Sequence, residues 1–324
     1  MHLLVQALLK APGQTLNLLP AGEVSLRKMD EETVRGKAGT RKLSLYALSG
    51  LSDGTPDYYW QDAGEHFFVD SSVVPEGWED ILPQLRKVEG AQDQKLRHER
   101  ATALTQHLEH ALAIEHVRVF DPDRLVAKAG QTVLVSAGHI AAVGDDGSVQ
   151  IPKRALRLDG HGRFLMAGLW DMHQHLHDDA GLLDLAAGIT TVRDMGNPSD
   201  NLAGLVDGYE SGADIGPRVI KVGLIDGRGP LQSRAGVYAD TAEENAGIPP
   251  AEVLRLATQG AARVMKRDKE YGRIGPGYVS DLILVDGDPT INISDLRKVR
   301  TVLRGDRLYN SAALWKSMGI APVP

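Results

Sequence analysis

The sequence of 324 residues predicts an α/β protein in which a strand–helix–strand segment is inserted into a composite β-structure. Residues 164–225 alternate apolar runs with helical stretches, which is typical of parallel strands buried on both faces. On either side, residues 114–163 and 273–311 consist of short strands and turns of similar character. We therefore expect these two flanking pieces to form one β-sandwich around an α/β segment spanning residues 164–272.

Residues 1–90 are expected to form an N-terminal α+β extension. The leucines of MHLLVQALL recur at helical spacing, and residues 42–48 alternate apolar and polar side chains as a half-buried strand does. Residues 91–113 are charged, lack proline and carry leucines at helical spacing. They predict a connector helix leading to the sandwich.

The inserted segment is expected to contain three buried strands, the helices that connect them and a last helix. The strands are expected at residues 164–172, 189–196 and 217–225. Gly188 is expected to end the helix that follows the first strand. The last helix is expected over residues 249–266, because Pro250 suits a first helical turn and Glu252 suits the positive end of the helix dipole.

Composition excludes several classes of function. The net charge is -7 and no basic stripe occurs, which argues against a nucleic-acid partner. The absence of cysteine excludes disulfides and thiolate metal sites. No run reaches the ~18 apolar residues of a membrane span, and the N-terminus lacks the pattern of a signal peptide. The location, cytoplasmic or periplasmic and secreted, stays open.

The stretch GLWDMHQHLH, residues 168–177, carries the strongest chemical signal. Residues i and i+2 of a strand project to the same face, so His173 and His175 are expected to point together from the carboxyl end of the first buried strand. Two imidazoles at that place can hold Zn²⁺ or a similar divalent metal. Hydrogen-bonded polar residues at a strand end are the alternative interpretation, and His177 is expected to begin the following loop.

Several stretches together are similar to the amidohydrolase superfamily, in the group of imidazolonepropionase-like and prolidase-like enzymes. Gly168–His175 resembles the start of that family's barrel, and residues 188–194 resemble its second strand. Residues 251–264 are similar to its last barrel helix, and residues 272–289 resemble its return into the β-sandwich. The resemblance covers roughly residues 114–310.

The resemblance implies a TIM-barrel hydrolase of carbon–nitrogen bonds that acts on a small-molecule or peptide-like substrate. It implies that His173 and His175 hold a divalent metal, most simply zinc, which activates a water molecule. Further ligands in the family are a carboxylated lysine, two more histidines and an aspartate that serves as the general base. Asp171 and Asp194 are candidates for outer-shell partners of the ligating histidines.

Most of such a barrel is missing from this chain. About 108 residues separate Phe164 from Arg273, whereas eight βα units need ~250 residues. All 11 histidines lie at or before His177, and no residue is assigned as the general base. We place a junction near residues 245–246. There, sequence typical of the approach to the third crossover helix is followed directly by sequence typical of the approach to the eighth. Either residues are absent from the given sequence or the protein has a true deletion, and the sequence is compatible with both explanations.

Two rival interpretations follow from the sequence. GLSDG, residues 50–54, matches the nucleophile elbow of serine hydrolases with Ser52 as nucleophile, but strand-like aromatics follow where a helix is needed. The second rival is a catalytically inactive barrel remnant that binds a partner or forms a homo-oligomer, because three parallel strands leave an open sheet edge.

Overall fold

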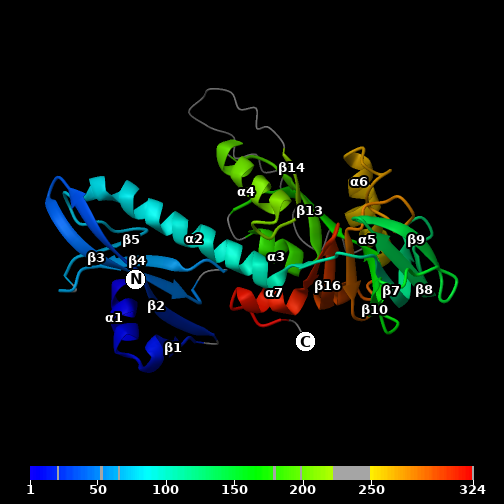
Figure 1. The fold of residues 1–324 in the computed structure, drawn as a ribbon, viewed down its shortest axis with the longest axis horizontal. Coiled ribbons are helices and arrows are strands. Elements are labelled where there is room, and N and C mark those ends of the chain that lie inside the picture. The colour runs from blue at the N-terminus through cyan, green and yellow to red at the C-terminus, as the bar shows by residue number, and fades with distance from the viewer. Residues whose placement is uncertain are drawn as a thin grey trace. The chain divides into compact units, whose positions relative to one another are not determined.

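We analysed a computed structural model that describes residues 1–19, 22–51, 54–64, 66–177, 180–197, 199–221 and 249–322, without the side chains of 199–201 (Figure 1). The chain forms two compact units, which are described separately. The first comprises Met1–Arg100 with Lys316–Ala321, and the second comprises Ala101–Trp315 with the last residues. None of the described helices is both long and apolar enough to span a membrane.

The first unit is built on one antiparallel sheet of five strands in sequential order. Its strands are β1 (Thr15–Asn17), β2 (Glu23–Gly36), β3 (Gly39–Ser49), β4 (Asp57–Gln61) and β5 (Phe68–Asp70). Helix α1 (His2–Lys10) buries Val5 and Leu8 in an apolar cluster with Leu48. Leu43 and Leu45 belong to a second cluster, with residues at the start of α2 (Leu82–Leu104). The short helices are η1 (Pro12–Gln14) and η2 (Glu79–Ile81).

The connector helix lies earlier in the chain than the sequence indicated. Helix α2 ends at Leu104, so the expectation of a helix over residues 91–113 is wrong at both ends. Leu108 and Leu112, which follow the helical spacing, instead pack into the core of the large sheet of the second unit. Pro83 occupies the first turn of α2, where its missing N–H costs no hydrogen bond.

The second unit contains a nine-stranded composite sheet. Its order is β6-β17-β16-β15-β11-β7-β8-β9, with β10 also paired to β7. The early strands are β6 (Gln106–His107), β7 (Leu112–Asp121), β8 (Val126–Ser136), β9 (His139–Asp145), β10 (Leu156–Asp159) and β11 (Phe164–Ala167). The late strands are β15 (Leu282–Val285), β16 (Val299–Arg304) and β17 (Arg307–Asn310). Strands from both predicted pieces lie in this sheet, and β11 stands between them, paired with β7 on one side and β15 on the other.

A parallel three-stranded sheet lies between these two pieces in the sequence. It consists of β12 (Leu169–Gln174), β13 (Ile189–Asp194) and β14 (Arg218–Lys221), connected by α3 (Ala180–Ala186) and α4 (Ser199–Ser211). The predicted last helix is the run α5 (Pro250–Arg255), η3 (Leu256–Gly260) and α6 (Ala261–Val264). The remaining helices are η4 (Ile293–Lys298) and α7 (Ser311–Ser317). The mixed α/β class is confirmed, but the described strands do not form a barrel.

The first predicted strand is divided in two at Gly168. The expectation of one continuous strand from Phe164 is wrong, because β11 pairs with β15 and β7 whereas β12 pairs with β13. A Cβ atom at Gly168 would lie 2.1 Å from Oγ1 of Thr190 on β13. The chain therefore crosses between the two sheets at a residue without a side chain.

Candidate metal centre at the end of the first parallel strand

The carboxyl ends of the three parallel strands meet at one edge of the small sheet. Gln174 on β12 is in register with Asp194 on β13, and Asp194 is in register with Lys221 on β14. Parallel α/β proteins bind their ligands at this edge. His173, the residue before Gln174, and His175, the residue after it, therefore stand where the sequence placed the site.

His173 and His175 are brought together in the structure. Their ring centroids lie 5.6 Å apart with an interplanar angle of 68°. Both side chains are exposed, as is His177 in the loop that follows. Two neighbouring imidazoles fit two of the four positions of a zinc site. They do not fill it, because no group of three or more histidine, aspartate or glutamate side chains suited to a metal occurs among the described residues.

Asp171 and Asp194 contact backbone amides in this site. The Asp171 carboxylate accepts a hydrogen bond from the backbone N–H of His173 at 2.9 Å. This bond fixes the backbone of the strand at His173. Asp194 is fully buried and accepts hydrogen bonds from the backbone N–H groups of Leu176 at 2.9 Å and Asn197 at 3.1 Å. Asp194 thereby ties the loop after β12, which begins with His175, to the loop after β13.

The side chain of Asn197 completes this connection. Its Nδ2 donates to the carbonyl of Leu176 at 2.7 Å and to Asp194 at 2.6 Å. The backbone N–H of Gly196 donates to the same carboxylate at 3.1 Å. Because an ionised carboxylate accepts about four hydrogen bonds, Asp194 is fully used in holding the two loops.

Asp184 is a buried acid beside the histidine pair that the sequence reasoning missed. It lies on α3 with 6% of its surface exposed, and Nε2 of Gln174 donates to both of its carboxylate oxygens at 3.2 Å. Burial raises the pKa of Asp184 to about 7, and the negative charge of Asp171 acts in the same direction. The signal was an aspartate within the otherwise apolar helix LLDLAAG.

Gln174 connects this acid to the site. It lies between His173 and His175 in the sequence, and its Oε1 atom is buried without a hydrogen-bond partner. A protonated Asp184 can donate a hydrogen bond, and an exchange of the amide orientation would turn Oε1 toward it as the acceptor.

Other features of the sequence analysis lie outside the described residues. These are Ser52 and the junction at residues 245–246.

Comparison with known proteins finds similarity in the C-terminal part of the chain. Residues 228–310 match the family model described as Amidohydrolase family. Over this segment the chain is similar to that family. A 76-residue stretch is 40% identical to imidazolonepropionase of Rubrobacter xylanophilus, covering 24% of the chain and 16% of that relative. The resemblance inferred from the residues is thus confirmed, although the family match does not include His173 and His175.

Solved structures of hydrolases are similar to this chain in fold. Phenylurea hydrolase B is similar with a TM-score of 0.54 and 14% identity, covering 64% of this chain and 98% of that one. A prolidase from Bifidobacterium longum is similar with a TM-score of 0.53 and 14% identity, covering 65% of this chain and 99% of that one. In both comparisons the similar region covers nearly the whole of the solved chain.

Proposed function

We propose that the chain serves the hydrolysis of a carbon–nitrogen bond, in an amide, peptide or cyclic amide, with a divalent metal held by His173 and His175. The observation that carries the proposal is the pairing of these two imidazoles at the carboxyl end of β12. Zinc suits imidazole nitrogen best among the common hydrolytic metals. The amidohydrolase family of residues 228–310 supports the same class of reaction.

The described residues have separate tasks in this proposal. His173 and His175 supply two nitrogen ligands, and Asp171 fixes the backbone from which His173 projects. Asp194 and Asn197 hold the loop that begins at His175 against its neighbour. A bound divalent ion would lower the pKa of a water molecule to ~7 and polarise the scissile carbonyl. No described residue is assigned as the general base.

The test combines hydrolysis with metal removal. We expect the purified chain to cleave a prolyl dipeptide or a cyclic amide, and a chelator to abolish the cleavage until zinc is restored. The double variant His173→Ala/His175→Ala should lose activity by at least about a hundredfold, because ligand loss removes the metal. His110→Ala, which removes an exposed histidine of the same unit, should retain it. Activity that survives both the chelator and the double variant would refute the proposal.

A non-catalytic role is the second candidate, and the topology of the small sheet favours it. Among the described strands, β12 and β14 each pair only with β13, so the sheet has two open edges. Unpaired strand edges promote association with a second strand. We expect a non-catalytic remnant to sediment as an oligomer and to lack chelator-sensitive hydrolysis. A monomer that hydrolyses amides would exclude this candidate.

A further inference from the structure

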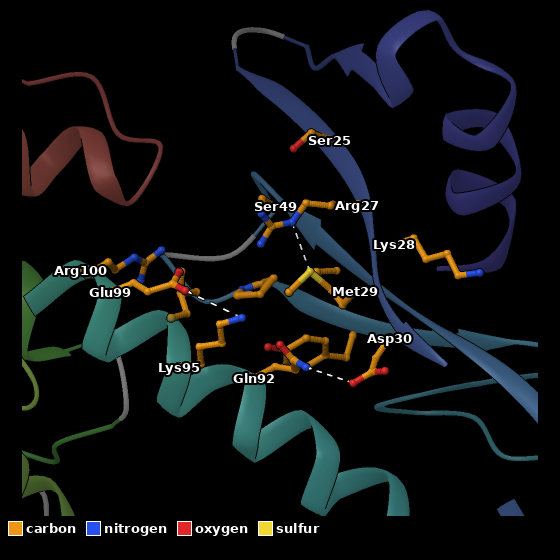
Figure 2. A pocket seen from close by; sticks show the side chains of 14 residues that line it. Ser25, Arg27, Lys28, Met29, Asp30, Ser49, Gln92, Lys95, Glu99 and Arg100 are labelled. Carbon is orange, nitrogen blue, oxygen red and sulfur yellow. Dashed lines mark hydrogen bonds and ion pairs between the residues drawn. The ribbon is translucent and has the colours of Figure 1, made fainter. Parts of the chain in front are cut away.

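The first unit contains a pocket of about 740 Å³ between its sheet and helix α2 (Figure 2). It lies outside the residues that match the amidohydrolase family, and nothing in the histidine site depends on it. Its walls are strands β2 and β3 on one side and the second half of α2 on the other.

Small side chains on the sheet create the hollow. Ser25 is in register with Ser49, and Arg27 is in register with Ala47, so these four residues share one face of β2 and β3. Three of the four have at most one side-chain heavy atom beyond Cβ. Little of the space beneath the helix is therefore filled from the sheet side.

Helix α2 faces this hollow with an unusual stripe. A helix that packs on a sheet normally turns an apolar stripe toward it. The first turns of α2 do so, since Leu85 lies in the apolar cluster and Val88 packs against it. The later residues that line the pocket follow the same helical spacing but are mostly polar: Gln92, Lys95, Leu96, Glu99 and Arg100. The stripe suits contact with a polar ligand.

Some basic side chains that line the pocket have weak or no ion pairs with carboxylates of the described residues. The Arg27 guanidinium donates through Nε to the sulfur of Met29 at 3.2 Å, and it has no ion pair among the described residues. Lys95 is 4.0 Å from Glu99, at the outer limit of an ion pair. The carboxylate of Asp30 accepts from the amide of Gln92 at 3.3 Å.

Lys28 does not contribute its charge to the same place. Its ammonium points away from the helix in Figure 2 and pairs with Glu31 at 2.5 Å. Arg100, on the helix, donates to the carbonyl of Gly54. We therefore take Arg27 from the strand and Lys95 from the helix as the cations that a ligand engages from opposite walls.

We propose that this pocket binds a small molecule carrying a carboxylate or phosphate group. Its oxyanion is held by Arg27 and Lys95, since guanidinium and ammonium groups form charge-assisted hydrogen bonds with such anions. Its carbon body rests on Met29, Ala47 and Leu96, which are apolar residues of the lining. The hydroxyl and amide groups around them give further hydrogen bonds.

The test uses succinate and inorganic phosphate as probes on the full chain, with uncharged succinamide as the matched neutral control. We expect saturable binding of at least one of the two anions by titration calorimetry, and none of succinamide. Preference for succinate or for phosphate tells which oxyanion the pocket takes. The variant Arg27→Gln should weaken binding roughly tenfold, the effect of removing one charge-assisted hydrogen bond.

Arg35→Gln is the control variant, because Arg35 is exposed on the same strand and does not line the pocket. It should bind the anion as the unchanged chain does. Lys95→Met provides a second disruption from the helix wall and should also weaken binding. Absence of binding by both anions, or equal effects of Arg27→Gln and Arg35→Gln in chains of unchanged circular dichroism, would overturn the proposal.

Discussion

At the scale of single residues, acids placed by the fold determine the surroundings of the histidine pair. The sequence located His173 and His175 through strand alternation alone, and the structure places their rings side by side. It did not reveal that Asp194 would be fully committed to loop amides or that Asp184 would be buried. Those partners belong to loops and to a helix whose approach depends on tertiary packing, which residue spacing does not encode.

The buried acid makes a prediction about pH. The pKa of Asp184 is raised to about 7 by burial, against ~3.9 in an unfolded chain. Its contribution to stability is therefore complete below pH ~4 and is lost as the pH rises toward 7. Asp184→Asn should remove this dependence and raise the free energy of unfolding above pH 7 by about 1–3 kcal/mol.

Urea denaturation at pH 4.5 and pH 7.5 measures this effect. The control is Asp207→Asn, which changes an exposed aspartate of α4 in the same unit. It should leave the pH dependence as it is in the unchanged chain. Equal pH dependence in the Asp184→Asn variant and the unchanged chain would show that Asp184 titrates normally.

At the scale of elements, the periodicity of apolar residues predicted which segments form helices or strands better than it predicted where these elements end. The apolar run beginning at Phe164 looked like one strand, because apolar residues continue from the fully buried β11 into β12, where only Trp170 is fully buried. This apolar run is divided only because the chain passes from one sheet to the other at Gly168. The leucine spacing of α2 continues beyond the end of the helix. The leucines that follow it, Leu108 and Leu112, are apolar because they pack in the core of the composite sheet. A buried side chain has the same apolar character in either element.

The crossing at Gly168 predicts a strong response to one methyl group. Gly168→Ala would place Cβ 2.1 Å from Thr190 Oγ1 and should lower the free energy of unfolding by about 2–4 kcal/mol. Gly204→Ala is the matched control, since a Cβ there meets nothing within 4 Å. Because Gly204 lies in helix α4, alanine should stabilise it by up to ~1 kcal/mol. Thermal unfolding of both variants measures the contrast, and similar shifts would contradict the geometry.

At the scale of the whole molecule, the composite sheet was predictable and the fate of the barrel was not. The two flanking pieces resembled each other in their strands and turns, and β11 joins them by pairing with β7 of the first piece and β15 of the second. The count of about 108 residues excluded eight βα units, and three parallel strands are described. One contact between these strands and the composite sheet is an ion pair, whose partners lie 63 residues apart in sequence.

That ion pair connects the two sheets of the second unit. Arg218 at the start of β14 donates to Asp281, which is 5% exposed and also accepts from the backbone N–H of Gly305 at 2.9 Å. Asp281→Asn leaves the half-buried charge of Arg218 without its partner and should destabilise the unit by about 2–3 kcal/mol. Urea denaturation checks this expectation, with the exposed Asp306→Asn as the control. A change below about 1 kcal/mol would show that the pair does not hold the sheets together.

X-ray absorption at the zinc edge of the zinc-loaded chain tests the central claim most directly. We predict one zinc per chain with two imidazole nitrogens at ~2.0–2.1 Å, both lost in the His173→Ala/His175→Ala variant. Zinc that is absent from the unchanged chain, or that keeps its two imidazole ligands in the double variant, would contradict the assignment of this pair as a metal centre.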